Sequence, residues 1–126
     1  MGNDRVVSLV VLDQGPIPFE EIERFDDPDL ETALDHDGAD PETASFRLVE
    51  IALDDLQDFE WLQRRPRERS TSYVVEAFGR GERLPPVVIT PTARNGVFGL
   101  LDGLNRAHAS LLLGRTTIRA YELLRP

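Results

Sequence analysis

Apolar and polar positions are patterned most clearly in the second half of the chain, where they predict short strands joined by turns. Apolar runs typical of strands cover residues 87–90, 97–101 and 116–124. The loop between the first two runs ends in Asn95-Gly96, a pair that favours a chain reversal. These two strands are therefore expected to form a hairpin.

Helical spacing of apolar residues predicts two helices in the same half of the chain. One begins at residue 105, directly after the hairpin, and ends at Gly114. The other can be capped by Ser70-Thr71 and stops at Gly79. Its apolar face carries Tyr73, Val74, Ala77 and Phe78.

The first half of the chain predicts two further strands. Residues 5–12 are rich in valine and apolar on both faces, which indicates a strand buried in the sheet. Gln14-Gly15-Pro16 is expected to end it. Residues 46–51 alternate in polarity and predict the second strand.

Between these strands the pattern is less regular. Residues 18–25 are expected to form one helical segment, with Ile22 and Phe25 on one side. Residues 26–42 are acidic and interrupted by proline and glycine, which predicts a loop with one helical turn at 30–34. Such a run is typical of a solvated insertion, and the functional alternative is a lid, or a mimic of a polyanion, over the basic half of the chain.

These elements predict an α+β fold with a small mixed β-sheet and two or three helices. A chain of 126 residues suits a single domain with its own core. We therefore expect one domain over residues 1–126, with an acidic N-terminal extension or insertion at about 13–45.

Composition excludes several kinds of chemistry. The chain has no cysteine, which excludes disulfides, thiolate metal sites and cysteine nucleophiles. Its two histidines, His36 and His108, do not have metal-ligand spacing. The apolar run over 6–12 is too short to span a membrane and lacks the flanks of a signal peptide, so a cytoplasmic protein with no membrane partner is expected.

Charge is unevenly distributed along the chain. The formal net charge is −9, with −15 over residues 1–60 and +6 over residues 61–126. The acidic half could therefore cover the basic half or repel nucleic acid from it. All 14 basic residues are arginines, so any recognition of phosphate must use arginine and backbone amides rather than lysine.

The most informative stretch runs from residue 99 to 114, where a strand, a tight turn and a helix follow one another. A helix amino terminus presents unpaired amides and the positive end of the helix dipole. Arg106, in the first turn, could add donors suited to a phosphate group. The plainer interpretation is that Asp102 caps the helix and Gly103 supplies a positive φ.

The segment DGLNRAHAS, residues 102–110, is similar to the signature of the ParB/sulfiredoxin superfamily, in which a strand runs into a G-x-x-R turn and an alanine-rich helix. The preceding segment LPPVVITPTARNGVFGLL resembles the hairpin of that superfamily. The likeness covers about residues 46–121 and is strongest over 84–114. It implies a ParB/sulfiredoxin-like fold whose turn and arginine hold phosphate groups of a nucleotide or phosphorylated substrate.

The turn differs from those of two branches of this superfamily. Sulfiredoxins carry a cysteine where this chain has Leu104, so the resemblance does not extend to their activity. The chromosome-partition branch binds and hydrolyses CTP with a G-E-R-R turn, in which Leu104 and Asn105 here replace the glutamate and the first arginine. We therefore do not expect a partition protein, and the net acidity argues against a DNA clamp.

A third branch consists of kinases that phosphorylate free serine and have a D-G-H-H-R turn. This chain keeps Asp102, Gly103 and Arg106 of that turn but neither histidine. The resemblance implies Asp102 as the base toward a substrate hydroxyl and Glu60 as a helping carboxylate. The plainer interpretation of Asp102 is a helix cap, and that of Glu60 is an acidic surface residue.

Two further residues are candidates for contact with a nucleotide or phosphate. Arg67 follows Pro66 where many members of the superfamily have a Pro-Arg pair beside the nucleotide or substrate. His108 lies one turn into the predicted helix, and packing is its alternative role. Trp61 is assigned to the core or its rim.

The sequence therefore predicts a nucleotide- or phosphate-binding ParB-like domain, acting as a phosphotransferase or nucleotide hydrolase on a small molecule. The alternatives are a non-catalytic binding or regulatory module and, third, a DNA-binding partition-type protein. The expected cofactor is ATP, ADP or CTP with Mg²⁺, the expected partners are that nucleotide and a small-molecule substrate, and a homodimer is left open. The candidate binding residues are Gly103, Leu104, Asn105, Arg106, Arg67 and His108, and the candidate catalytic residues are Asp102 and Glu60.

Overall fold

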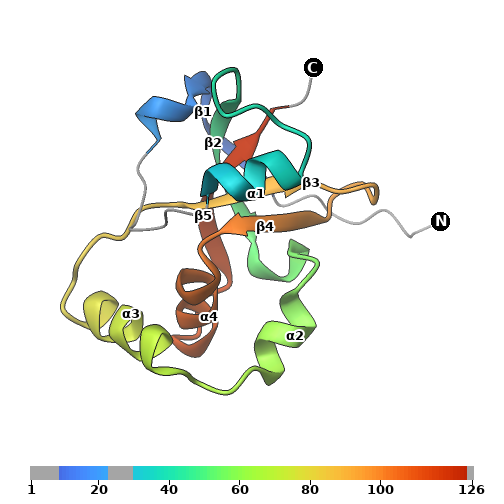
Figure 1. The fold of residues 1–126 in the computed structure, drawn as a ribbon. Coiled ribbons are helices and arrows are strands. Elements are labelled where there is room, and N and C mark those ends of the chain that lie inside the picture. Colours follow the sequence, from blue (N-terminus) through green and yellow to red (C-terminus); the bar gives the residue numbers. More distant parts are fainter. Residues whose placement is uncertain (1–8, 23–29, 125–126) are drawn as a thin grey trace.

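The centre of the protein is a five-stranded sheet, seen in a computed structural model that describes residues 9–22 and 30–124 (Figure 1). The strands lie in the order β1-β2-β5-β3-β4. Neighbouring strands are antiparallel except β5 and β3, which are parallel, so the sheet is mixed and the predicted α+β class is confirmed. The strands are β1 (Val10–Pro18), β2 (Ser45–Ala52), β3 (Val87–Pro91), β4 (Phe98–Asp102) and β5 (Thr117–Leu123).

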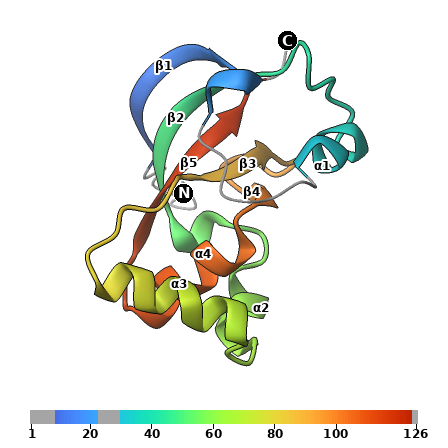
Figure 2. The ribbon, with the colours of Figure 1, turned by 60° about the vertical axis from the view of Figure 1, so that its left-hand side comes forward.

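Helices occupy two sides of this sheet. In Figures 1 and 2, α2, α3 and α4 gather on one side, whereas α1 lies near β3 and β4 on the other. Within the described residues, the helices are α1 (Leu30–His36), α2 (Phe59–Arg64), α3 (Arg69–Gly79) and α4 (Leu104–Leu112), with short 3₁₀ turns at Phe19–Glu21 and Leu53–Asp55.

Alternate residues of the strands contribute to two hydrophobic clusters. In β3, Val87 and Ile89 belong to a cluster shared with α2 and α4. Val88, between them, belongs to a second cluster that includes Leu30 and Leu34 of α1. Because both faces of β3 are covered, its sequence is a continuous apolar run rather than an alternating one.

β1 differs from its prediction in both position and environment. The strand does not end at Gln14-Gly15-Pro16 but continues to Pro18, with shifts in its register against β2. It is an edge strand, and Val10 and Leu12 are 55% and 45% exposed, so the expectation of a buried strand is wrong. The predicted residues 5–8 lie outside the described part of the chain.

The acidic segment contains more structure than the single turn predicted for it. α1 extends to His36, and its Leu30 and Leu34 are 1% and 0% exposed because they share one helix face and pack on the sheet. Thr90 of β3 also donates a hydrogen bond to the Asp37 carboxylate at 2.8 Å. The helical segment predicted over 18–25 is reduced to the 3₁₀ turn followed by buried Ile22, and Phe25 lies outside the described residues.

α2 was not predicted, and α3 begins without its predicted cap. Glu68 precedes α3, and no side-chain hydrogen bond caps that helix. Ser70-Thr71 instead lies inside the first turn, and Thr71 is buried against α4. In the described residues, every helix is too short or too polar to cross a bilayer.

The turn from β4 into α4 requires a glycine. Gly103 immediately precedes α4 and has a φ of 106°, in the left-handed region, which confirms the interpretation that it supplies a positive φ. A Cβ at this position would lie 2.5 Å from Cγ1 and 2.8 Å from Cβ of Val87. The turn is therefore packed closely against β3.

We expect Gly103→Ala to lower the free energy of unfolding by more than about 2 kcal/mol, because a strained backbone combines with the contact to Val87. Gly96→Ala is the matched control: its φ is 80°, but nothing lies within 4 Å of the added Cβ. Gly96→Ala should lower the free energy of unfolding only through backbone strain, by about 1–2 kcal/mol. Urea unfolding measures both variants, and equal losses would contradict a constraint at Val87.

Candidate binding site at the amino end of α4

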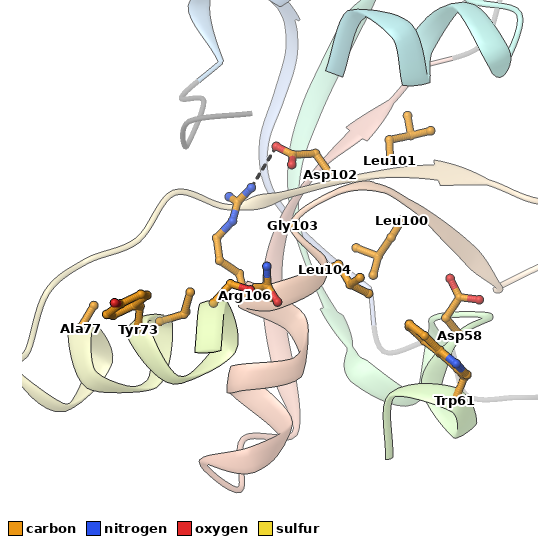
Figure 3. A pocket seen from close by; sticks show the side chains of 13 residues that line it. Asp58, Trp61, Tyr73, Ala77, Leu100, Leu101, Asp102, Gly103, Leu104 and Arg106 are labelled. Atoms are coloured by element: carbon orange, nitrogen blue, oxygen red, sulfur yellow. Dashed lines mark hydrogen bonds and ion pairs between the residues drawn. The ribbon is translucent and has the colours of Figure 1, made fainter. Parts of the chain in front are cut away.

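A cavity of about 1030 Å³ opens at the amino end of α4, between β4, α2 and α3 (Figure 3). Its wall includes the turn and first residues of α4 singled out from the sequence, namely Asp102, Gly103, Leu104, Asn105 and Arg106. The remaining wall residues come from β4, α3 and the start of α2. Cavities of this size hold small-molecule ligands and cofactors.

The backbone amides at the start of α4 border this cavity. The amide of Ala107 donates to the carbonyl of Gly103 at 2.9 Å, which is the first hydrogen bond of the helix. The amides of Leu104, Asn105 and Arg106 precede that bond, at the positive end of the helix dipole. The wall therefore includes a helix terminus of the kind that attracts a negatively charged group.

Arg106 is a buried member of an ion pair rather than an exposed cation. Its side chain donates from Nη2 to Oδ2 of Asp102 at 2.9 Å, a contact visible in Figure 3. Nη1 donates to the carbonyl oxygens of Pro85 and Pro86 at 2.8 and 2.7 Å. The residue is only 3% exposed. Its guanidinium therefore ties the turn to the segment that leads into β3, and contact with a phosphate stays a prediction.

Asp102 has the complementary role in this pair. Gly103 occupies the cap position of α4, and no side-chain hydrogen bond caps the helix, so the interpretation of Asp102 as the cap is wrong. Its carboxylate is 5% exposed and faces Arg106. The two charged side chains that the D-G-x-x-R turn retains thus balance one another at the edge of the cavity.

Two aromatic side chains on the cavity wall were missed as site residues by sequence reasoning. Trp61 of α2 and Tyr73 of α3 line the cavity and are 51% and 62% exposed. The sequence placed Tyr73 on the same apolar helix face as Val74, yet Val74 is 6% exposed whereas Tyr73 is largely exposed. Large aromatic residues among polar neighbours, as in the segment Glu60-Trp61-Leu62-Gln63, were the signal that could have indicated a surface role.

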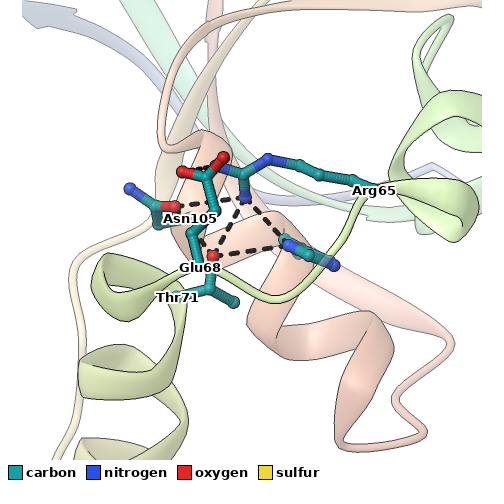
Figure 4. A network of polar contacts seen from close by, with 5 residues as sticks. Arg65, Glu68, Thr71 and Asn105 are labelled. Atoms are coloured by element: carbon teal, nitrogen blue, oxygen red, sulfur yellow. Dashed lines mark hydrogen bonds and ion pairs between the residues drawn. The ribbon is translucent and has the colours of Figure 1, made fainter.

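A polar network holds α3 and α4 together beside the cavity (Figure 4). Arg65, which follows α2, donates from Nη1 to Thr71 Oγ1 at 2.9 Å, to Asn105 Oδ1 at 3.2 Å and to His108 Nδ1 at 2.8 Å. Its Nη2 donates to Glu68 at 3.1 Å. Thr71 in turn donates to Asn105 Oδ1 at 2.9 Å. The amide side chain of the wall residue Asn105 is therefore fixed by this network.

The network determines the state of His108. Because guanidinium nitrogens only donate, Nδ1 of His108 must accept, which places the proton of the neutral ring on Nε2. Burial, and then the positive charge of Arg65, lower the pKa of His108 below 6.5. The carboxylate of Glu68 and the backbone of Arg65 act in the opposite direction but do not reverse the shift in this pKa.

The other predicted site residues lie away from the cavity wall. His108 is buried beside Arg65 and Thr71, at 1% exposure. The Glu60 side chain is 86% exposed and lies 3.9 Å from Arg64. Arg67 is exposed and donates to Ser72 at 2.9 Å. Direct roles of these three residues in binding or catalysis stay predictions, and Asp58 is the carboxylate that shares the wall with Asp102.

We expect the free energy of unfolding to fall as the pH drops below 6.5. The unfolded chain takes up a proton on His108 before the folded protein does, because the folded-state pKa is lowered. His108→Gln should reduce this slope by up to about 1.4 kcal/mol per pH unit, whereas His36→Gln, at an exposed position, should leave the His108 contribution intact. Urea unfolding between pH 7.5 and 5 measures how the free energy of unfolding changes with pH. An unchanged pH dependence in His108→Gln would contradict the lowered pKa of His108.

Comparison with known proteins gives a similarity of fold. No protein-family model matches the chain, and no curated protein matches its sequence. Among solved structures, the crystal structure of sulfiredoxin from Arabidopsis thaliana matches with a TM-score of 0.47 and 18% sequence identity, over 60% of this chain and 82% of that chain.

Proposed function

We propose that the chain binds a nucleotide or a similar phosphorylated small molecule in the cavity at the amino end of α4. The observation that carries this proposal is that one wall joins a helix amino terminus to two exposed aromatic side chains, Trp61 and Tyr73. The amides of residues 104–106 would bind the phosphate groups. A planar base would stack on Trp61 or Tyr73, as nucleobases do on aromatic side chains.

The ligand would meet these amides rather than an unpaired guanidinium. Arg106 is bonded to Asp102 and to two proline carbonyls, so its first contribution is to hold the turn in place. Its Nη2 lies 3.2 Å from the position of a Cβ on Gly103, which puts the charge directly beside the turn. The positive charge of Arg106 would therefore attract a phosphate at the turn while Arg106 stays bonded to Asp102.

A phosphotransferase or nucleotide hydrolase needs a carboxylate to orient the attacking hydroxyl or water. Asp58 and Asp102 are the carboxylates on the wall, and we assign this role to one of them. Mg²⁺ commonly binds through one or two carboxylates together with the phosphates of its substrate, and Asp58 on the wall would supply one such carboxylate. Bound there, the ion would neutralise phosphate charge; within the described residues, no group of three potential ligand side chains offers a separate protein-only site.

A non-catalytic binding module is the second candidate. It is favoured by the mutual pairing of Asp102 and Arg106, since both charged side chains of the turn have a structural role without any ligand. In this case the cavity binds its ligand but transfers no phosphate. Binding and turnover therefore need separate tests.

Trp61 provides a reporter for binding because it is the single tryptophan of the chain and lines the cavity. We expect ATP, ADP or CTP, tested with and without Mg²⁺, to change its fluorescence saturably. Tyr73→Ala should weaken binding about tenfold through the loss of one stacking surface. Leu112→Ala, at an exposed position that does not line the cavity, is the control. If none of these nucleotides produces a saturable change in fluorescence or in calorimetry, the proposal fails.

Turnover distinguishes the enzyme from the module. With nucleotide, Mg²⁺ and a hydroxyl acceptor such as free serine, an enzyme should release or transfer phosphate. Asp58→Asn should then lose at least about 100-fold in rate while retaining binding, whereas Asp102→Asn also removes the buried partner of Arg106 and should lower the stability of the fold as well. Glu60→Gln serves as the comparison, because a normal rate in it removes Glu60 as a helper. Saturable binding without turnover for any acceptor would show that the protein is the non-catalytic binding module.

A further inference from the structure

We propose that the protein has a second site, for a compact anion carrying phosphate groups, in a groove of about 540 Å³ on another part of the surface. The groove is bounded by the segment before β3, the carboxyl end of α4 and the start of β5. It shares only Arg106 with the cavity described above. We call it the arginine groove, after Arg83, Arg115 and Arg119 on its wall.

The three arginines of this groove outnumber the two carboxylates on its wall. Each is exposed, and within residues 9–22 and 30–124 none of the three lies within ion-pair distance of a carboxylate. Three guanidiniums around one groove repel one another. In a protein with a formal net charge of −9, such a local concentration of positive charge indicates a place for an anion.

Neither of the two carboxylates on the groove wall forms an ion pair with these three arginines. Glu82 accepts hydrogen bonds from Arg80 at 2.6 and 3.2 Å, so that pair is internally balanced. Glu50 accepts a hydrogen bond from Thr117 Oγ1 at 2.8 Å. Although Glu50 lies opposite Arg119 in the pairing of β2 with β5, its carboxylate bonds to Thr117 rather than to that arginine.

One of the arginines is held in place without using its donors. The guanidinium of Arg115 lies over the ring of Phe78, with 4.3 Å between its carbon and the ring centroid. Stacking of this kind orients the planar group while its N–H groups remain available for a ligand. The Arg115 amide also donates to the carbonyl of Ser110 at 3.0 Å, which fixes the backbone at this point.

The groove fits a small ligand better than a polymer. Its volume lies within the range of small-molecule sites, and forks of guanidinium donors match the oxygen atoms of phosphate. A nucleic acid would have to approach a molecule whose first 60 residues carry a formal charge of −15. We therefore assign the groove to a free anion with two or more negative charges, of which pyrophosphate is the simplest probe.

The test is a titration of the ¹⁵N-labelled protein with pyrophosphate at constant ionic strength, followed by amide chemical shifts. Saturable shifts are expected for groove residues such as Gly114, Thr116 and Thr117. Arg83→Gln and Arg119→Gln should each weaken binding about fivefold or more through the loss of one charge-assisted contact. Arg94→Gln removes the same charge from an exposed position outside both hollows and should leave the affinity unchanged.

Several outcomes would overturn the proposal. Equal weakening in Arg94→Gln would show general electrostatic attraction, and absence of saturable shifts would show that no site exists. Stronger binding of a short DNA or RNA oligonucleotide that pyrophosphate cannot displace would assign the groove to nucleic acid. Tyr73→Ala separates the two hollows: groove binding should persist in it, so failure of the nucleotide proposal leaves this one standing, and the reverse also holds.

Discussion

The fixed position of the Arg106 guanidinium is the constraint on which the rest of the site depends. A buried cation is stable only when it is fully paired, and removal of one partner of such a pair typically costs about 3–5 kcal/mol. Here the partners are Asp102 at the end of β4 and the carbonyls of Pro85 and Pro86 before β3. One side chain therefore sets how the hairpin, the turn and α4 lie relative to one another.

The buried Arg106 side chain is shared by two hollows of different chemical character. The wall of the larger cavity includes both the amides at the start of α4 and the side chains of Trp61 and Tyr73. This combination suits a ligand with both a ring and a charged group. Exposed arginines surround the smaller groove, which has little aromatic surface. Because the proline carbonyls bonded to Arg106 belong to the wall of the groove, both hollows depend on the same buried group.

The sequence predicted those parts whose determinants are local. The β3–β4 hairpin and α4 were predicted because apolar runs and the special backbone of Gly103 are properties of short segments. The bonds of Arg106 to the proline carbonyls and the contact of Arg65 with His108 were not, since they join residues 20 to 43 positions apart. The exposure of β1 was also missed, because periodicity reports which positions are apolar but not which element covers them. The exposure of Trp61, which lines the cavity, was missed for the same reason.

The outer strand of the sheet has a further consequence for how copies of this domain meet. An unpaired strand edge can recruit a strand from another molecule and extend the sheet indefinitely. Along β1, however, Pro16 and Pro18 have no N–H to donate, and the Gly15 amide is bonded to the Asp13 side chain at 3.0 Å. The second half of this edge therefore offers a neighbour almost no donors, which opposes fibre-like association along that half of β1.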